Sequence, residues 1–210
     1  MRSRLISVSH SLKRAFLLLS VLGLALLASA PAAAQRGAIT VSRNLSQLTD
    51  RAGIIVRGNV ISAKVEKHPE LGGHTIVVTL RVKKTLKGQV GDTFVFRQYI
   101  WDIRDRYDAA GYQKGQEVLL MMLTPNRYGL TSPAGMDQGR FRILRNREGK
   151  EVAVNGVGNF KLFHGMEAQV QAKAARLSPQ LAKMLQEKRA RPVPVQDLEL
   201  LITDSVKGSE

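Results

Sequence analysis

Histidines and carboxylates are the side chains of this chain that could carry catalysis or bind a metal, and their spacing supports neither. His10 lies in an apolar leader, His68 and His74 flank a glycine-rich turn, and His164 stands alone. A zinc site needs closely spaced His, Cys or carboxylate ligands, and the chain has no Cys. We therefore expect His68 and His74 to be surface residues of a turn, and we predict no metal site and no cofactor.

Motifs of the common enzyme classes are also missing from the sequence. The segment 111–115 has two glycines but lacks the G-K-[ST] of a phosphate-binding loop, and there is neither a G-x-S-x-G elbow nor an H-E-x-x-H. Asp102, Asp105 and Asp108 are three residues apart, whereas a calcium loop needs alternating oxygens and a closing Glu. The sequence predicts a protein that is not an enzyme. A carboxylate pair assembled in space, and hence an enzyme of unassigned type, stays open as an alternative.

The stretch 98–107 is the strongest candidate for binding. It concentrates the only Trp, two of the four Tyr and two Arg at the end of a predicted strand and in the loop after it. Such residues dominate binding hot spots because they bury a large area at low entropic cost. In the alternative interpretation, the Trp fills one end of a barrel and the arginines pair with nearby aspartates. The candidate binding residues are Tyr99, Trp101, Arg104, Arg106 and Tyr107.

The first 34 residues have the pattern of an export signal. Basic residues precede an apolar run from Ala15 to Leu27, which is shorter than the roughly 18–20 residues that span a bilayer. Small residues follow in two A-x-A patterns, the second of which predicts cleavage between Ala34 and Gln35. Because no Cys follows, we expect neither a lipid anchor nor disulfides. The sequence predicts a periplasmic or secreted protein.

The basic charge of the chain points to a second possible function. The net charge is +15, and removal of the four leader cations leaves about +11. An excess of this size attracts anionic partners, although it also serves solubility alone. Export separates the protein from nucleic acid, so the alternative function is electrostatic binding to anionic envelope polymers or lipid head groups. The cations that would serve it are Lys173, Arg176, Lys183, Lys188, Arg189 and Arg191.

Alternating apolar residues predict that the region from 51 to 160 is mainly β. The clearest example is 76–82, and the continuous apolar run 118–123 predicts a strand buried on both faces. Near Gly58 to Ile61 the apolar face changes parity, which predicts a β-bulge. We expect a small antiparallel OB-like barrel of five to seven strands. The expected strands are 54–65, 76–82, 94–100, 118–123, 128–131, 141–143 and 152–154.

Helical patterns replace the strands after His164. We expect helices over 165–176, after an N-cap at Ser178, and over 197–206, where an apolar stripe either docks on the barrel or belongs to a mobile arm. The predicted organisation is therefore a cleaved signal peptide (1–34), a lead-in segment (35–50) with a short helix at 45–51, an OB-like barrel (51–160) and a helical C-terminal region (165–210).

Three short motifs carry a resemblance to a known family: AGIIVRGNV at 52–60, TIVVTLRV at 75–82 followed by TLKG, and KGQEVLL at 114–120. The stretch from 52 to about 123, and further to Ile143, is similar to the OB-fold barrel of the netrin-like and tissue inhibitor of metalloproteinases superfamily, and to exported bacterial proteins built on that scheme. The resemblance implies an exported binding module with a protein partner, for which a peptidase is one candidate. The zinc-chelating N-terminal Cys of the animal inhibitors has no counterpart in this chain. The oligomeric state is left open.

Overall fold

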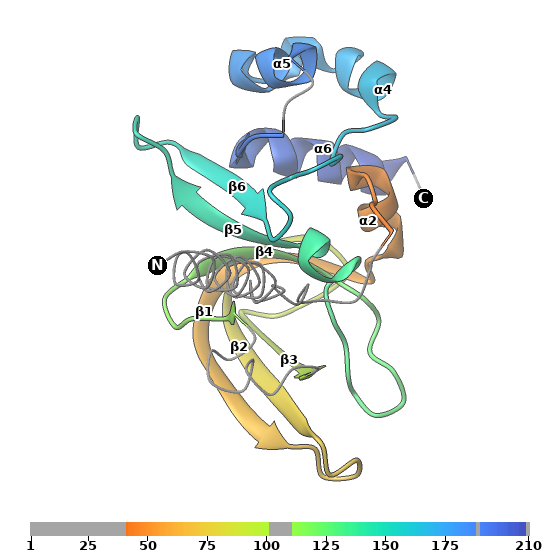
Figure 1. Ribbon diagram of the computed structural model, residues 1–210, viewed down its shortest axis with the longest axis vertical. Helices are drawn as coiled ribbons and strands as arrows, with labels where there is room; N and C mark the ends of the chain where they lie inside the picture. The colour runs from red at the N-terminus through yellow and green to blue at the C-terminus, as the bar shows by residue number, and fades with distance from the viewer. Residues whose placement is uncertain (1–40, 101–110, 188–189, 209–210) are drawn as a thin grey trace, which may run out of the picture. The chain divides into compact units, whose positions relative to one another are not determined.

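One antiparallel sheet of seven strands organises the chain, in the order β3-β2-β1-β4-β5-β6-β7 (Figure 1). The computed structural model describes residues 41–100, 111–187 and 190–208. The strands are Ile54–Lys67 (β1), His74–Lys87 (β2), Thr93–Tyr99 (β3), Glu117–Met122 (β4), Arg140–Arg145 (β5), Glu151–Asn155 (β6) and Val193–Pro194 (β7). The helices are Leu45–Arg51 (α2), Met136–Gly139 (η2), Glu167–Gln171 (α4), Ala174–Arg176 (η3), Pro179–Gln186 (α5) and Val195–Lys207 (α6).

The long strands β1 and β2 are bent because their register shifts along the pair. The first shift follows Ile55 and the last precedes Ser62, so the bulge predicted near 58–61 is confirmed. Gly58 is required at this bend, since a Cβ atom there would lie 2.4 Å from the carbonyl oxygen of Arg81. The bend turns the distal half of the hairpin away from the plane of β4 (Figure 1).

Strand β4 separates two hydrophobic cores and is buried on both faces, as its apolar run predicted. Leu119 and Met121 belong to one core, whereas Val118, Leu120 and Met122 belong to the other. All five are at most 1% exposed. The first core also holds the helices, and the second lies within the bend of β1, β2 and β3.

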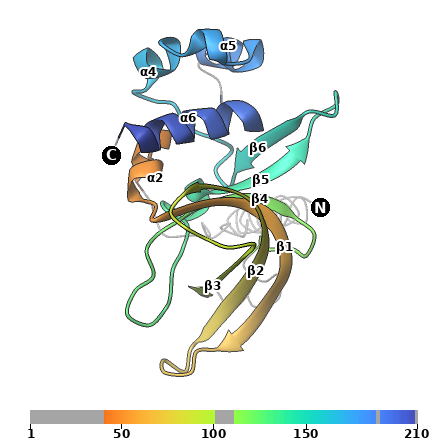
Figure 2. The same cartoon turned by 180° about the vertical axis from the view of Figure 1, so that it is seen from behind.

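The C-terminal helix α6 packs against α2, β2 and β6 (Figures 1 and 2). Its residues Leu198, Leu201 and Ile202 are at most 3% exposed and complete the first core. The helix is therefore docked, and the mobile-arm alternative is excluded for this segment. Helix α5 begins as predicted, with Ser178 as N-cap and Pro179 at the first position.

The sheet does not close into a barrel. Strands β3 and β7 form its two ends, and within the described ranges neither pairs with the other. The short strand expected at 128–131 is reduced to one bridge between Leu130 and Arg97. There the side chain of Asn126 accepts the N–H groups of Tyr128 and Leu130 and turns the chain away. The mainly β fold, the strand number and the helical appendage are confirmed, and the sheet that carries them is open.

Candidate binding site at the outer edge of strand β3

Strand β3 directs every second residue's backbone groups away from the sheet. It pairs with β2 along its whole length, and just past its end the N–H of Ile100 donates to the C=O of His74 on β2 (3.3 Å). Backbone groups alternate in direction along an antiparallel strand, so even-numbered residues of β3 bond to β2 and odd-numbered residues point outward. The C=O of Arg97 fits this alternation, because it accepts the N–H of Thr131 from outside the sheet (2.9 Å).

Val95 is an outward position that has no backbone partner among the described residues. No hydrogen bond joins its N–H or C=O to any residue in the described ranges. Its side chain is 56% exposed, and that of Tyr99, on the same face, is 39% exposed. A strand edge with free polar groups and apolar side chains is a template on which another chain can add as a strand.

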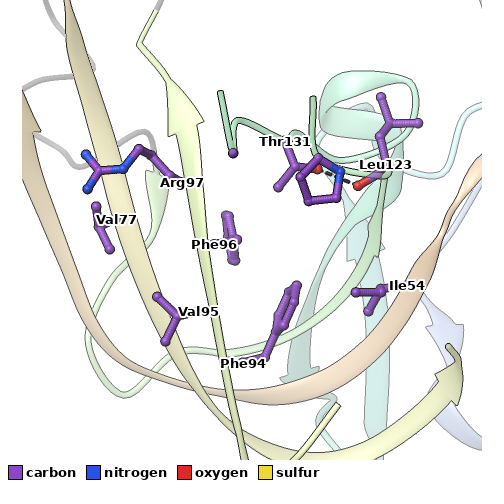
Figure 3. Close-up of a pocket in the computed structure, with 10 residues that line it drawn as sticks. Ile54, Val77, Phe94, Val95, Phe96, Arg97, Leu123 and Thr131 are labelled. Atoms are coloured by element: carbon purple, nitrogen blue, oxygen red, sulfur yellow. Dashed lines mark hydrogen bonds between the residues drawn. The ribbon is translucent and has the colours of Figure 1, made fainter. Parts of the chain in front are cut away.

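A groove runs along this edge, between β3 and residues 123–131, which we call the wall segment. The wall segment meets β3 at Arg97 and is tied back on itself by the hydroxyl of Thr131, which donates to the C=O of Leu123 (2.5 Å). Figure 3 shows the rings of Phe94 and Phe96 on the side of β3 that faces Leu123 and Thr131. The groove has a volume of about 240 Å³, and its lining includes Ile54, Phe94, Val95, Leu123, Pro125 and Gly129.

The volume of the groove indicates which class of ligand it can hold. Small-molecule pockets usually enclose roughly 300–1,000 Å³ and bury most of the ligand, so a groove of about 240 Å³ is small for that class. An extended chain needs less room, because each residue seats one side chain while its backbone bonds to the strand edge. The groove therefore suits a few side chains of a polypeptide better than a metabolite.

His68 fixes the wall segment to the turn between β1 and β2. Its Nδ1 accepts the N–H groups of Glu70 and Leu71 (3.2 Å each). The proton of a neutral imidazole must then sit on Nε2, which donates to the C=O of Tyr128 (3.0 Å). The expectation of a surface histidine is wrong for His68, which is 3% exposed because three backbone groups satisfy its ring in the interior.

A second concentration of polar groups, the Arg57 cluster, joins the sheet to α6. Arg57 on β1 donates to Glu117 on β4 (2.7 Å), Glu151 on β6 (2.6 Å) and Glu199 on α6 (3.1 Å). Lys83 on β2 adds a further bond to Glu117 (2.7 Å). Three strands and a helix thus meet at one guanidinium group, and a fourth strand joins them through Glu117.

The charges of the Arg57 cluster compensate one another. Burial by itself would lower the pKa of Arg57, but the hydrogen bonds that it donates to three carboxylates outweigh this effect and raise that pKa above its usual range. Burial would raise the pKa of Glu117, yet bonds from Lys83 and Arg57 hold it below its ordinary value. Glu199 also accepts from Lys84 (2.6 Å). The cluster therefore locks α6 to the sheet and leaves no charge uncompensated for a ligand.

Other candidate chemistry in the described ranges is structural. The N–H and the hydroxyl of Ser178 both donate to the buried carboxylate of Asp197, which ties the start of α5 to the first turn of α6. No imidazole bonds to this pair in the described chain, so nothing there activates the hydroxyl as a nucleophile. The described His, Asp and Glu residues form no group of three that could hold a metal ion.

Of the predicted binding residues, Tyr99 lies in the strand beside the groove, as the last residue of β3. Sequence reasoning missed Val95, although the alternation of Phe94 and Phe96 with Thr93, Val95 and Arg97 signalled its outward side chain. It also missed the role of His68. Trp101, Arg104, Arg106, Tyr107 and the cleavage-site residues Ala34 and Gln35 lie outside the described residues.

Comparison with known proteins adds no family assignment. No protein-family model matches the chain, and no curated protein sequence matches it. Among the helices in the described part of the chain, none has both the length and the apolar character needed to cross a membrane. A functional proposal for this chain is therefore built on the geometry of the β3 edge.

Proposed function

We propose that this protein is an exported, non-enzymatic binding module that captures an extended segment of a partner protein at the outer edge of β3. The observation that carries the proposal is that the backbone of Val95, beside an apolar groove, has no hydrogen-bond partner within residues 41–100, 111–187 and 190–208. In strand addition, main-chain hydrogen bonds supply affinity and side-chain pockets supply specificity. Both elements are present at this edge, on a strand held rigidly by β2.

The location and the partner class in this proposal come from the sequence. The basic, apolar and small-residue segments of the first 34 residues support export, and the resemblance to the netrin-like barrel supports a protein partner, with a peptidase as one candidate. Any inhibition of such a peptidase would need chemistry other than Cys-led zinc chelation, because the chain has no Cys.

Electrostatic binding to anionic polymers is less well supported by the helical region. Four of the six cations named for it bond to carboxylates of the same chain. Lys173 and Arg176 meet Asp204, while Lys183 and Arg191 meet Glu187. Such pairing lowers the charge available to an external polymer. The remaining two, Lys188 and Arg189, lie outside the described residues.

A pair of variants at Val95 tests strand capture. A mixture of short synthetic peptides with both termini free is passed over the immobilised protein, and retained peptides are identified by mass spectrometry and measured by fluorescence polarisation. Val95→Pro removes the outward N–H and should weaken the tightest peptide about tenfold or more, whereas Val95→Thr keeps it and should stay within about threefold. Retention of no peptide, or equal affinity of the wild type and Val95→Pro, would overturn the proposal.

A further inference from the structure

We infer that the segment captured at β3 is the free end of a partner chain and not the middle of one of its strands. This inference rests on the proposed function and adds the class of partner segment to it. The reason is that one end of the groove is closed by backbone contacts of this chain. The closed end is where the wall segment meets Arg97, and we call it the apex.

The apex blocks the path of an added strand. An incoming strand that bonds to the outward N–H and C=O of Val95 must next reach Arg97, the following outward position. That position is already taken, since the C=O of Arg97 accepts the N–H of Thr131 (2.9 Å) and Leu130 forms the bridge beside it. A strand continuing along β3 would therefore meet the backbone of Leu130 end on. A chain that ends before Arg97 does not meet this obstacle.

The wall segment cannot readily move aside, because its turn is held by its own hydrogen bonds. The side chain of Asn126 accepts the N–H groups of Tyr128 (2.9 Å) and Leu130 (3.0 Å). The N–H of Asn126 also donates to the C=O of Leu130 (2.9 Å). These bonds keep the turn rigid, and the bond from the N–H of Thr131 to the C=O of Arg97 would have to break before the wall segment could separate from β3.

His68 pins the same turn from outside. Its Nε2–H donates to the C=O of Tyr128, and its Nδ1 is held by the N–H groups of Glu70 and Leu71 in the turn after β1. The ring is buried, so these bonds do not exchange freely with water. His68 is thus a positioning residue: it touches no residue of the incoming segment but keeps the apex closed.

The lining of the groove fits the last residues of an extended chain. Phe94 of β3, Leu123 and Pro125 of the wall segment and Ile54 of β1 line a space of about 240 Å³. An apolar side chain near the end of the partner can pack there while its backbone bonds to Val95. The partner class is therefore a flexible protein terminus that carries an apolar residue.

Peptide extension tests the inference. The tightest peptide from the selection is synthesised in its original form and with a short Gly-Ser extension on the amino or on the carboxyl end. We expect one extension to weaken binding about tenfold or more and the other to change it less than about threefold. The sensitive end is the one at the apex: the amino end for an antiparallel strand and the carboxyl end for a parallel one. Equal tolerance or equal loss of both extensions would overturn the inference.

A variant of His68 gives an independent readout. His68→Ala should open the apex, so the ratio between the affinities of the unextended and the extended peptide at the sensitive end should fall below about threefold. His74→Ala, at the other histidine of the same hairpin, is the matched control and should keep the full loss. If His68→Ala does not fold by circular dichroism, His68→Gln takes its place. Unchanged end selectivity in a folded His68 variant would count against the inference, whereas insensitivity to Val95→Pro would defeat the proposed function itself.

Discussion

The Arg57 cluster and the outer edge of β3 belong to one sheet, but they differ in whether their polar groups have hydrogen-bond partners within the described chain. In the cluster, partly buried charges from β1, β4, β6 and α6 all find partners. At the β3 edge, the backbone of Val95 has no partner in the described chain, and water can solvate it at little cost. Stability is therefore concentrated where the sheet meets α6, whereas the surface for which we propose binding is separate. Changes at the edge should leave the fold intact.

Loss of the central cation is the largest expected effect. Arg57→Ala leaves three carboxylates without their shared partner and should lower the free energy of unfolding by about 3–5 kcal/mol, measured by urea denaturation. Arg142→Ala removes an exposed arginine of β5 and should change the free energy of unfolding by less than about 0.5 kcal/mol. Similar effects of the two variants would show that the cluster is no more important than surface charge.

Proline substitutions along β3 test the direction of its backbone groups. Gln98 directs its N–H toward β2, so Gln98→Pro should cost about 3 kcal/mol more than Gln98→Ala. Val95 directs its N–H outward, so Val95→Pro should cost less than about 1 kcal/mol more than Val95→Ala. The two differences are measured by thermal and urea unfolding. Comparable costs at both positions would contradict an open edge at Val95.

Removal of the imidazole of His68 should have an intermediate effect. His68→Ala leaves the C=O of Tyr128 and the N–H groups of Glu70 and Leu71 without their partner, and should cost about 1–3 kcal/mol. Native-state hydrogen exchange should become faster at residues of the wall segment and of the turn after β1, while the core of α6 keeps its protection. Uniform acceleration throughout the protein would instead indicate a global loss of stability.

The smallest expected effect is the loss of the Asp204 contribution to stability at low pH. Hydrogen bonding from Lys173 (2.8 Å) holds the pKa of Asp204 below its ordinary value. The contribution of this carboxylate is therefore present above the ordinary pKa of Asp and is lost as the pH falls through the lowered pKa of the folded state. Asp204→Asn should cost up to about 1 kcal/mol near neutral pH, and the difference from the wild type should vanish in strong acid.

The local features of the fold were predictable because short-range physics determines them. The bulge in β1, the double burial of β4 and the start of α5 at Ser178 follow from patterns within a few residues. The order of strands does not, since β1 pairs with β4 across about sixty residues and no periodicity encodes that choice. The open edge of β3 follows from this order, and so it was not predictable either.

The candidate site was predictable only in part, for the same reason. Tyr99 was named as a candidate because its residue type is common in binding sites, and its role there stays a prediction. Val95 resembles any outward valine until the strand order shows that no described strand pairs with its outward backbone groups. His68 resembles a turn residue until Tyr128, sixty positions later, is brought against it. Residue type and alternation can be read locally, whereas an edge or an apex exists only after assembly.

The position of α6 in the chain has a consequence for how the protein is made. Glu199 lies 142 residues after its partner Arg57, and Leu198 completes the first core from the same helix. The β1–β2 hairpin has neighbouring partners and can form early, but the core beneath α6 cannot close until that helix has left the ribosome. A nascent chain of this protein therefore stays only partly folded through most of its synthesis, and the last helix sets the moment at which the native state becomes accessible.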